Sequence, residues 1–183
     1  MVINMNNITI HTKRTEMKFP LPFITPQIIK DAINDKETIE FMSAIPTMEY
    51  TEKDALNFIE FLKYTENSNE ELELGIFDIN TKKFIGMCTL ENINNKYSVC
   101  ELGYWLDKKY VGKGYMTECA NAIIQFAKNE LNMKSINAFV VTEHKKSILL
   151  LERLGFVRMQ LLENDDENKG RLVNRYWYKL QLQ

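Results

Sequence analysis

The sequence predicts a mixed α/β domain, on the evidence of three patterns along its 183 residues. Apolar residues recur at helical spacings in the first third and again after Gly114, whereas they alternate or form short runs between these regions. Apolar residues make up 45% of the chain, which at this length suffices for a core without disulfides or a structural metal. The cysteines lack the paired spacing of a zinc site or disulfide scaffold, so we expect reduced core thiols at Cys88, Cys100 and Cys119.

The first third predicts a short strand followed by two or three amphipathic helices. The strand is expected around residues 17–21, and Pro26 and Pro46 punctuate the helices. Thr51 suits the N-cap of the third helix because its hydroxyl can accept a hydrogen bond from a free backbone N–H. One face of that helix should be buried, because apolar residues recur every three or four positions at Ala55, Phe58, Ile59 and Leu62.

The middle of the chain predicts three antiparallel strands joined by short turns. In the first of them, apolar residues alternate with Glu73 and Gly75. The polar stretch at 94–96 is short enough for a hairpin turn between the other two. The three strands are expected at residues 72–76, 84–90 and 99–106.

The last part of the chain predicts two helices and three strands. The longer helix carries one apolar stripe from Met116 to Leu131 and ends at Asn132, and the second helix is closed by Gly155. Acidic residues 165–167 are interpreted as a solvated hairpin between the last two strands. The strands are expected at 136–141, 156–162 and 173–182, and the second helix at 147–154.

Charge and composition exclude several function classes. The 23 Lys and Arg against 25 Asp and Glu leave a net charge of −2, which argues against a nucleic-acid partner. No apolar run of about 18 residues and no charged-then-apolar leader is readable, so we expect neither a membrane partner nor secretion, but a cytoplasmic protein. The two histidines, His11 and His144, suggest no ligand set, so no metal is expected, and His144 is interpreted as a solvated loop residue.

The junction at residues 103–115 carries the most chemical information. A buried strand passes there through a basic loop with two glycines into the longer helix. The first turn of a helix presents N–H groups without intrahelical partners, and the helix dipole adds partial positive charge. Gly112 and Gly114 let a ligand approach the backbone closely, so we expect an anion to bind there.

The spacing of this loop excludes two nucleotide-binding motifs. A P-loop requires the sequence Gly-Lys-Ser/Thr and a further glycine five residues before that Gly. Here Gly114 is followed by Tyr115, and no glycine stands five residues before it. A dinucleotide fingerprint requires a third glycine where Thr117 stands and an acidic residue after the next strand, where Thr142 lies.

Three motifs give the chain a family resemblance. Glu-Leu-Gly-Tyr-Trp-Leu at 101–106, Gly-Lys-Gly-Tyr-Met-Thr-Glu at 112–118 and Leu-Glu-Arg-Leu-Gly-Phe at 151–156 resemble GNAT acetyltransferases of the RimJ/RimL type. The resemblance covers residues 14–181 and implies one N-acetyltransferase domain over 1–183 that depends on acetyl-CoA. It also implies the acyl-CoA N-acyltransferase fold, in which a mixed, mostly antiparallel sheet has helices on both faces and a splay between two strands.

The resemblance further implies a set of cofactor-binding residues. In that family the pantetheine arm threads the splay, and the loop equivalent to 109–114 binds the pyrophosphate with backbone amides. Lys109 stands where that loop usually starts with Gln or Arg, and His144 replaces the Asn of the usual Asn-x-x-Ser. Leu151 replaces the tyrosine of many GNAT enzymes, as in RimJ/RimL-like proteins. The implied residues are Trp105, Leu106, Lys109, Val111, Gly112, Lys113, Gly114, Tyr115, Met116, His144 and Ser147.

Transfer of acetyl from a thioester to an amine requires a base and an acid. Direct attack needs a neutral amine, and Glu101 is the first candidate for its base, ahead of Glu91 and Glu143. Ser147 is the candidate acid that hydrogen-bonds the leaving thiolate. Glu101 can equally be a structural carboxylate and Ser147 a helix N-cap.

A further aromatic set is interpreted as core and cleft lining: Tyr104, Trp105, Tyr176, Trp177 and Tyr178.

The acceptor is left open between a protein N-terminal amine and a small molecule such as a polyamine, an aminoglycoside or a metabolite. Its specificity is expected in the helices at 26–66 and in the final hairpin. Two alternatives are a non-catalytic acyl-CoA sensor and a structural module that binds no cofactor. Exposed sheet edges near the C-terminus suggest a homodimer.

Overall fold

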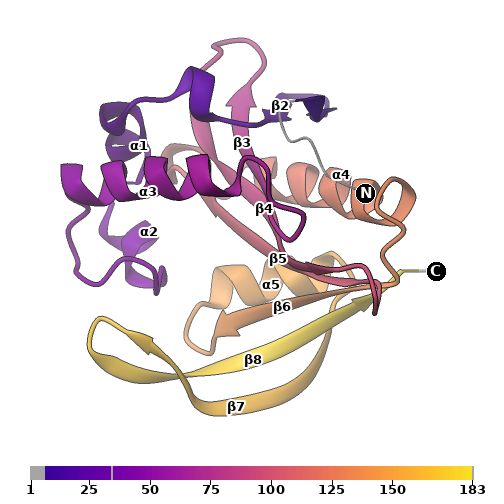
Figure 1. Cartoon of the computed structure of the whole chain (residues 1–183). Coiled ribbons are helices and arrows are strands. Elements are labelled where there is room, and N and C mark those ends of the chain that lie inside the picture. The colour runs from indigo at the N-terminus through magenta and orange to yellow at the C-terminus, as the bar shows by residue number, and fades with distance from the viewer. Residues whose placement is uncertain (1–6, 34, 183) are drawn as a thin grey trace.

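In the computed structural model, which describes residues 7–33 and 35–182, the described strands form one sheet in the order β1-β2-β3-β4-β5-β6-β8-β7 (Figure 1). Its antiparallel strands confirm those predicted for the middle of the chain. The strands are β1 (Thr9–His11), β2 (Thr15–Lys18), β3 (Leu72–Asp78), β4 (Phe84–Asn94), β5 (Val99–Leu106), β6 (Ser135–Val141), β7 (Val157–Asn168) and β8 (Arg171–Gln181).

The helices cover both faces of this sheet. Figure 1 shows α1 and α3 in front of the strands, and α4 and α5 behind them. No helix among the described residues is long and apolar enough to cross a membrane. The α-helices are α1 (Pro26–Ile33), α2 (Lys36–Glu40), α3 (Glu52–Thr65), α4 (Tyr115–Asn129) and α5 (Lys145–Arg153), and the short 3-10 helices are η2 (Leu21–Phe23) and η3 (Lys108–Tyr110).

The sheet splays between its two parallel strands. Residues Val99–Glu101 of β5 pair with Ser135–Asn137 of β6, and within the described part of the chain the rest of β5 has no strand partner on that side. All the other pairs in the sheet are antiparallel. Figure 1 shows the two strands diverging from the end where they pair. The expected mixed sheet with a splay is therefore confirmed.

Two helices show how local sequence fixes the elements around the site. Thr51 caps α3 in a reciprocal arrangement, since its Oγ1 accepts from the N–H of Asp54 at 3.2 Å while the Asp54 carboxylate accepts from the N–H of Thr51 at 2.8 Å. The apolar stripe of α4 is buried against the sheet. This helix ends at Asn129, three residues before the expected end, and Asn132 has a φ of +55° in the turn that follows. The three cysteines are buried and free, as predicted.

The C-terminal hairpin differs from the prediction. The turn lies at Lys169 and Gly170, so acidic residues 165–167 belong to β7 rather than to a solvated hairpin. Asp165 accepts a hydrogen bond from Arg175 Nε at 2.7 Å, and Asp166 accepts one from Ser43 at 2.7 Å. The turn signal was masked because the Lys-Gly pair follows a run of polar residues that are compatible with either element. The strand β1 was not predicted either.

The start of α5 also corrects two interpretations. The helix begins at Lys145 with His144 at its N-cap position, so Ser147 lies inside the first turn and is not the cap. His144 is not a solvated loop residue, because its ring stacks on Phe41 with the centroids 4.3 Å apart. Burial, and then the charge of Lys146, lower the pKa of His144 to about 4, so the ring is neutral at neutral pH.

Candidate active site

A cavity of about 1190 Å³ opens where β5 leaves β6. Its walls come from β3, β4, β5 and β6, from α2 and α3 with the segment between them, from the first turn of α4, from α5, and from Asp166 of β7 and Arg175 of β8. Segments from both ends of the chain therefore meet around the splay. The loop before α4 follows the end of β5 at Leu106, whereas the lining carboxylate Glu91 lies opposite Glu101 near the start of β5, so the two occupy different ends of the cavity.

The loop before α4 presents unpaired backbone donors to this cavity. Gly112 and Gly114 line it, with φ angles of +76° and +80° that favour glycine. The first hydrogen bond of α4 runs from the N–H of Glu118 to the carbonyl of Gly114, at 3.1 Å. Within the described chain, none of the backbone N–H groups of residues 112–117 donates a hydrogen bond. Such a row of donors at a helix N-terminus is suited to a phosphate group.

Most of the residues expected to bind the cofactor lie around the cavity. Two of them, Lys109 and Lys113, do not line it, and both are exposed. The backbone N–H of Lys109 donates to the Asp107 carboxylate at 2.9 Å and so caps the start of η3. The expected residues that line the cavity are Trp105, Leu106, Val111, Gly112, Gly114, Tyr115, Met116, His144 and Ser147.

Ser147 and Tyr104 form a hydroxyl pair across the splay. Tyr104 Oη and Ser147 Oγ are 2.7 Å apart, and both residues line the cavity. Burial raises the pKa of Tyr104, so its phenol holds its proton at neutral pH. The pair can therefore donate a hydrogen bond to an anion in the cavity. Sequence analysis identified Ser147 but assigned Tyr104 only to the core and the cleft lining.

The carboxylates expected to act as a base occupy different places. Glu91 lines the cavity, whereas Glu101, which lies directly opposite it on β5, does not. Burial raises the pKa of Glu101, against the effect of a hydrogen bond from Asn92. Glu143 is exposed, accepts a hydrogen bond from Thr142 at 2.9 Å and does not line the cavity.

A glycine in β5 makes room for the Glu91 carboxylate. Thr89 donates a hydrogen bond to Glu91 Oε1 at 2.8 Å. A Cβ atom added to Gly103 would overlap both Glu91 Oε1 and Thr89 Oγ1. The carboxylate therefore lies across the backbone of β5 at Gly103, close to the point where the splay begins.

Two further glutamates line the same end, and sequence analysis missed both. Glu73 is 3% exposed, and burial, followed by the charges of Glu91 and Glu71, raises its pKa to about 8. Burial and the charge of Glu91 raise the pKa of Glu71 to about 6. Alternation in β3 suggests that Glu73 faces solvent, but all seven residues of that strand are buried. The available signal was the spacing of two between Glu71 and Glu73, which places both on one face of a strand.

Comparisons with known proteins agree with this geometry. A family model described as the acetyltransferase (GNAT) domain matches residues 25–157. The chain is 27% identical over 173 residues to "Uncharacterized N-acetyltransferase p20" of Bacillus licheniformis, covering 94% of this chain and 95% of that protein. It is 35% identical over 83 residues to the ribosomal protein uS5-alanine N-acetyltransferase of Escherichia coli K12, covering 45% and 43%. The crystal structure of the microcin C7 self-immunity acetyltransferase MccE, in complex with acetyl-CoA and AMP, matches with a TM-score of 0.80 at 21% identity over 93% of each chain.

Proposed function

We propose, from the premise that this chain belongs to the GNAT acetyltransferase family, that acetyl-CoA enters its cavity along the splay and that the amine enters from the acidic end. The chain is an acyltransferase whose acetyl donor is acetyl-CoA. One observation carries the placement of the donor. The unpaired N–H groups of residues 112–117 lie beside the same cavity that the splay opens, so a diphosphate held there directs the pantetheine arm along β5.

The residues of the cavity divide the proton transfers between them. The acceptor must lose a proton before it attacks the thioester carbonyl, and Glu91 lies in the cavity, held by Thr89 across Gly103. Glu101 accepts that proton through water if Glu91 does not. The leaving thiolate needs a proton or a strong hydrogen bond, and the pair of Ser147 and Tyr104 supplies it.

No cysteine takes part in this scheme, and the amine attacks the thioester directly. Burial raises the pKa of Cys119 to about 11 and that of Cys100 to about 12, and it raises the pKa of Cys88 well above its ordinary value. None of the three lines the cavity. A thiolate, which would be the nucleophile of a covalent route, is therefore absent at neutral pH.

A protein N-terminal amine is the first candidate for the acceptor, because the matched relative from Escherichia coli is named for acetylating the alanine of a ribosomal protein. The lining favours a second candidate, a polyamine. Asp54, Glu71 and Glu91 face the cavity, and carboxylates at its acceptor end attract a substrate with more than one positive charge.

The experiment is a release assay for free thiol from acetyl-CoA. Its acceptors are a peptide with an N-terminal alanine, the same peptide already N-acetylated, spermidine and an aminoglycoside. We expect release with the free peptide or with spermidine and none with the blocked peptide. Release no faster than hydrolysis with every acceptor, while coenzyme A still binds, identifies a sensor and contradicts the proposal.

The edge of the sheet supports a homodimer. β7 is the last strand of the order, and its side chains Val157, Met159 and Leu161 are exposed. An unpaired edge of this length with apolar side chains is suited to pairing with a second copy. Light scattering coupled to gel filtration tests this, and a monomer at micromolar concentration contradicts it.

A further inference from the structure

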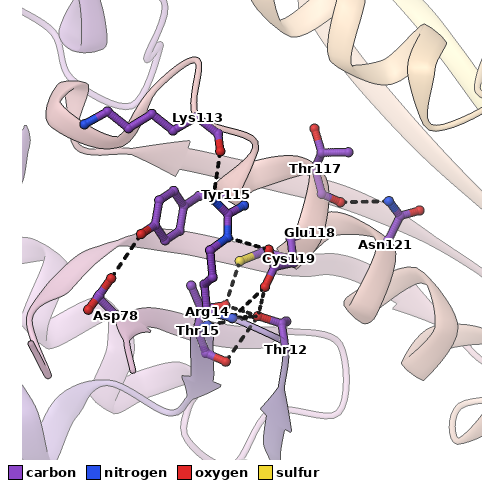
Figure 2. Close-up of polar contacts among 10 residues, drawn as sticks. All are labelled: Thr12, Arg14, Thr15, Asp78, Lys113, Tyr115, Thr117, Glu118, Cys119 and Asn121. Carbon is purple, nitrogen blue, oxygen red and sulfur yellow. Dashed lines mark hydrogen bonds and ion pairs between the residues drawn. The ribbon is translucent and has the colours of Figure 1, made fainter. Parts of the chain in front are cut away.

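Arg14 lies outside the segment matched by the family model, yet it contacts the start of α4 (Figure 2). It follows β1, and its backbone N–H donates to Glu118 Oε1 at 2.8 Å. Its Nε donates to Glu118 Oε2 at 2.8 Å, and its Nη1 donates to the carbonyl oxygen of Lys113 at 2.9 Å. One guanidinium therefore joins the first turn of the helix to the loop that precedes it.

The guanidinium is held in place from several sides. It lies 4.1 Å from the centroid of the Tyr115 ring, whose hydroxyl donates to Asp78 at 3.2 Å. Glu118 also accepts a hydrogen bond from Thr12 at 2.5 Å. Burial acts to raise the pKa of Glu118, but the hydrogen bonds from Thr12 and Arg14 outweigh it and lower the pKa, so the carboxylate stays ionised. The ion pair between Arg14 and the ionised Glu118 therefore holds the guanidinium in one orientation.

Because a peptide bond is planar, the contact between Arg14 and the Lys113 carbonyl also fixes the direction of the Gly114 N–H. The carbonyl of Lys113 and the N–H of Gly114 belong to one trans peptide, so they point in opposite directions. Because Arg14 binds the carbonyl, the N–H of Gly114 points away from Arg14. Gly114 lines the cavity and Lys113 does not.

We propose that Arg14 is a positioning residue for acetyl-CoA, which holds the Lys113–Gly114 peptide so that the N–H of Gly114 faces the diphosphate. This inference rests on the proposed placement of the cofactor. Arg14 also offsets a conflict at the same helix end. A carboxylate in the first turn, such as Glu118, opposes a bound anion, and the ion pair with Arg14 neutralises it.

The role requires arginine rather than a positive charge alone. The guanidinium uses Nε for Glu118 and Nη1 for Lys113, so it reaches both acceptors at a fixed angle. A lysine has one nitrogen at the end of a flexible stem. The informative substitution is therefore Arg14→Lys, with Arg171→Lys on the exposed end of β8 as the matched control.

The test compares three acetyl donors with the full chain: acetyl-CoA, its 3′-dephospho form and S-acetyl-pantetheine, which has no diphosphate. For Arg14→Lys we expect KM for both diphosphate donors to rise about tenfold, while kcat at saturation stays within twofold. The kinetics with S-acetyl-pantetheine should be unchanged, and Arg171→Lys should match the parent protein. If Arg14→Lys folds poorly, Arg14→Gln, which is too short to bind the Lys113 carbonyl and keep its contact with Glu118, should produce the same pattern.

Three outcomes overturn the inference. Equal losses with all three donors mean that Arg14 only stabilises the fold. A loss with acetyl-CoA but not with its dephospho form moves Arg14 to the 3′-phosphate. If Arg14→Lys shows no loss of activity with any of the three donors, Arg14 has no positioning role. Failure of the parent protein to bind coenzyme A in a calorimetric titration would instead refute the proposed function, so the two failures are distinguishable.

Discussion

Replacing Glu73 with glutamine should remove a loss of stability that this one carboxyl causes as the pH rises. The folded chain raises its pKa from 4.5 to about 8, chiefly through burial and then through the charges of Glu91 and Glu71. A carboxyl with a higher pKa in the folded chain holds its proton more tightly there, so its contribution is fully present below pH 4.5 and is lost as the pH rises toward 8. Between these two pKa values the free energy of unfolding falls by roughly 1.4 kcal/mol for each step of one in pH, so the loss between pH 4.5 and pH 7 is about 3 kcal/mol.

The assay is urea unfolding of the parent protein and of Glu73→Gln at several values between pH 5 and pH 8. Glutamine has a similar shape and does not ionise, so the advantage of the variant over the parent protein should grow as the pH rises and reach about 3 kcal/mol at pH 7. Glu163→Gln on the exposed part of β7 is the matched control and should follow the parent at every pH. Parallel stability curves for the parent and Glu73→Gln would refute the reasoning, because they would mean that Glu73 is ionised in the folded chain.

Three other substitutions test the site and its frame. Gly112→Ala should raise KM for acetyl-CoA about tenfold, because a φ of +76° is strained for alanine. The matched control is Gly170→Ala, at a φ of +77° and with the same open space. It should lower the free energy of unfolding by a similar amount, roughly 1 kcal/mol, and leave KM unchanged. Equal KM values for both variants would contradict the role of the loop. Ser147→Ala should lower kcat about tenfold and leave the affinity for coenzyme A measured by calorimetry within twofold, and unchanged turnover would remove its role as the acid. Thr51→Ala should lower the free energy of unfolding by about 1 kcal/mol without changing kcat, and an unchanged midpoint in urea would show that the capping box is not formed.

The sequence predicted the elements whose signals are local. The stripe of α4, the cap of α3 and the three antiparallel strands all depend on spacing within one element or between neighbours in the sequence. The errors occurred where tertiary contacts override spacing. Residues 165–167 resemble a solvated turn, but Arg175 and Ser43 bind two of them and extend β7. Glu73 has the alternation of an exposed residue and is buried, because α3 covers that face of β3.

The site was predictable in the part that the backbone forms and not in the part that side chains form. A glycine loop before a helix presents free N–H groups whatever surrounds it, so Gly112 and Gly114 were identifiable. Arg14 is separated from Lys113 by 99 positions, and the role that we propose for it depends on the direction in which one carbonyl points.

Gly103 shows most directly why the acceptor end could not be derived from sequence. A glycine in the middle of a strand normally weakens it, and sequence analysis gave this one no role of its own. In the fold, the absence of a Cβ allows Thr89 and Glu91 to cross β5 where it leaves β6. Any side chain at 103 would displace the carboxylate from the place where we propose that the amine loses its proton. The glycine is therefore as specific a feature of the acceptor end as Glu91 itself, although it carries no functional group.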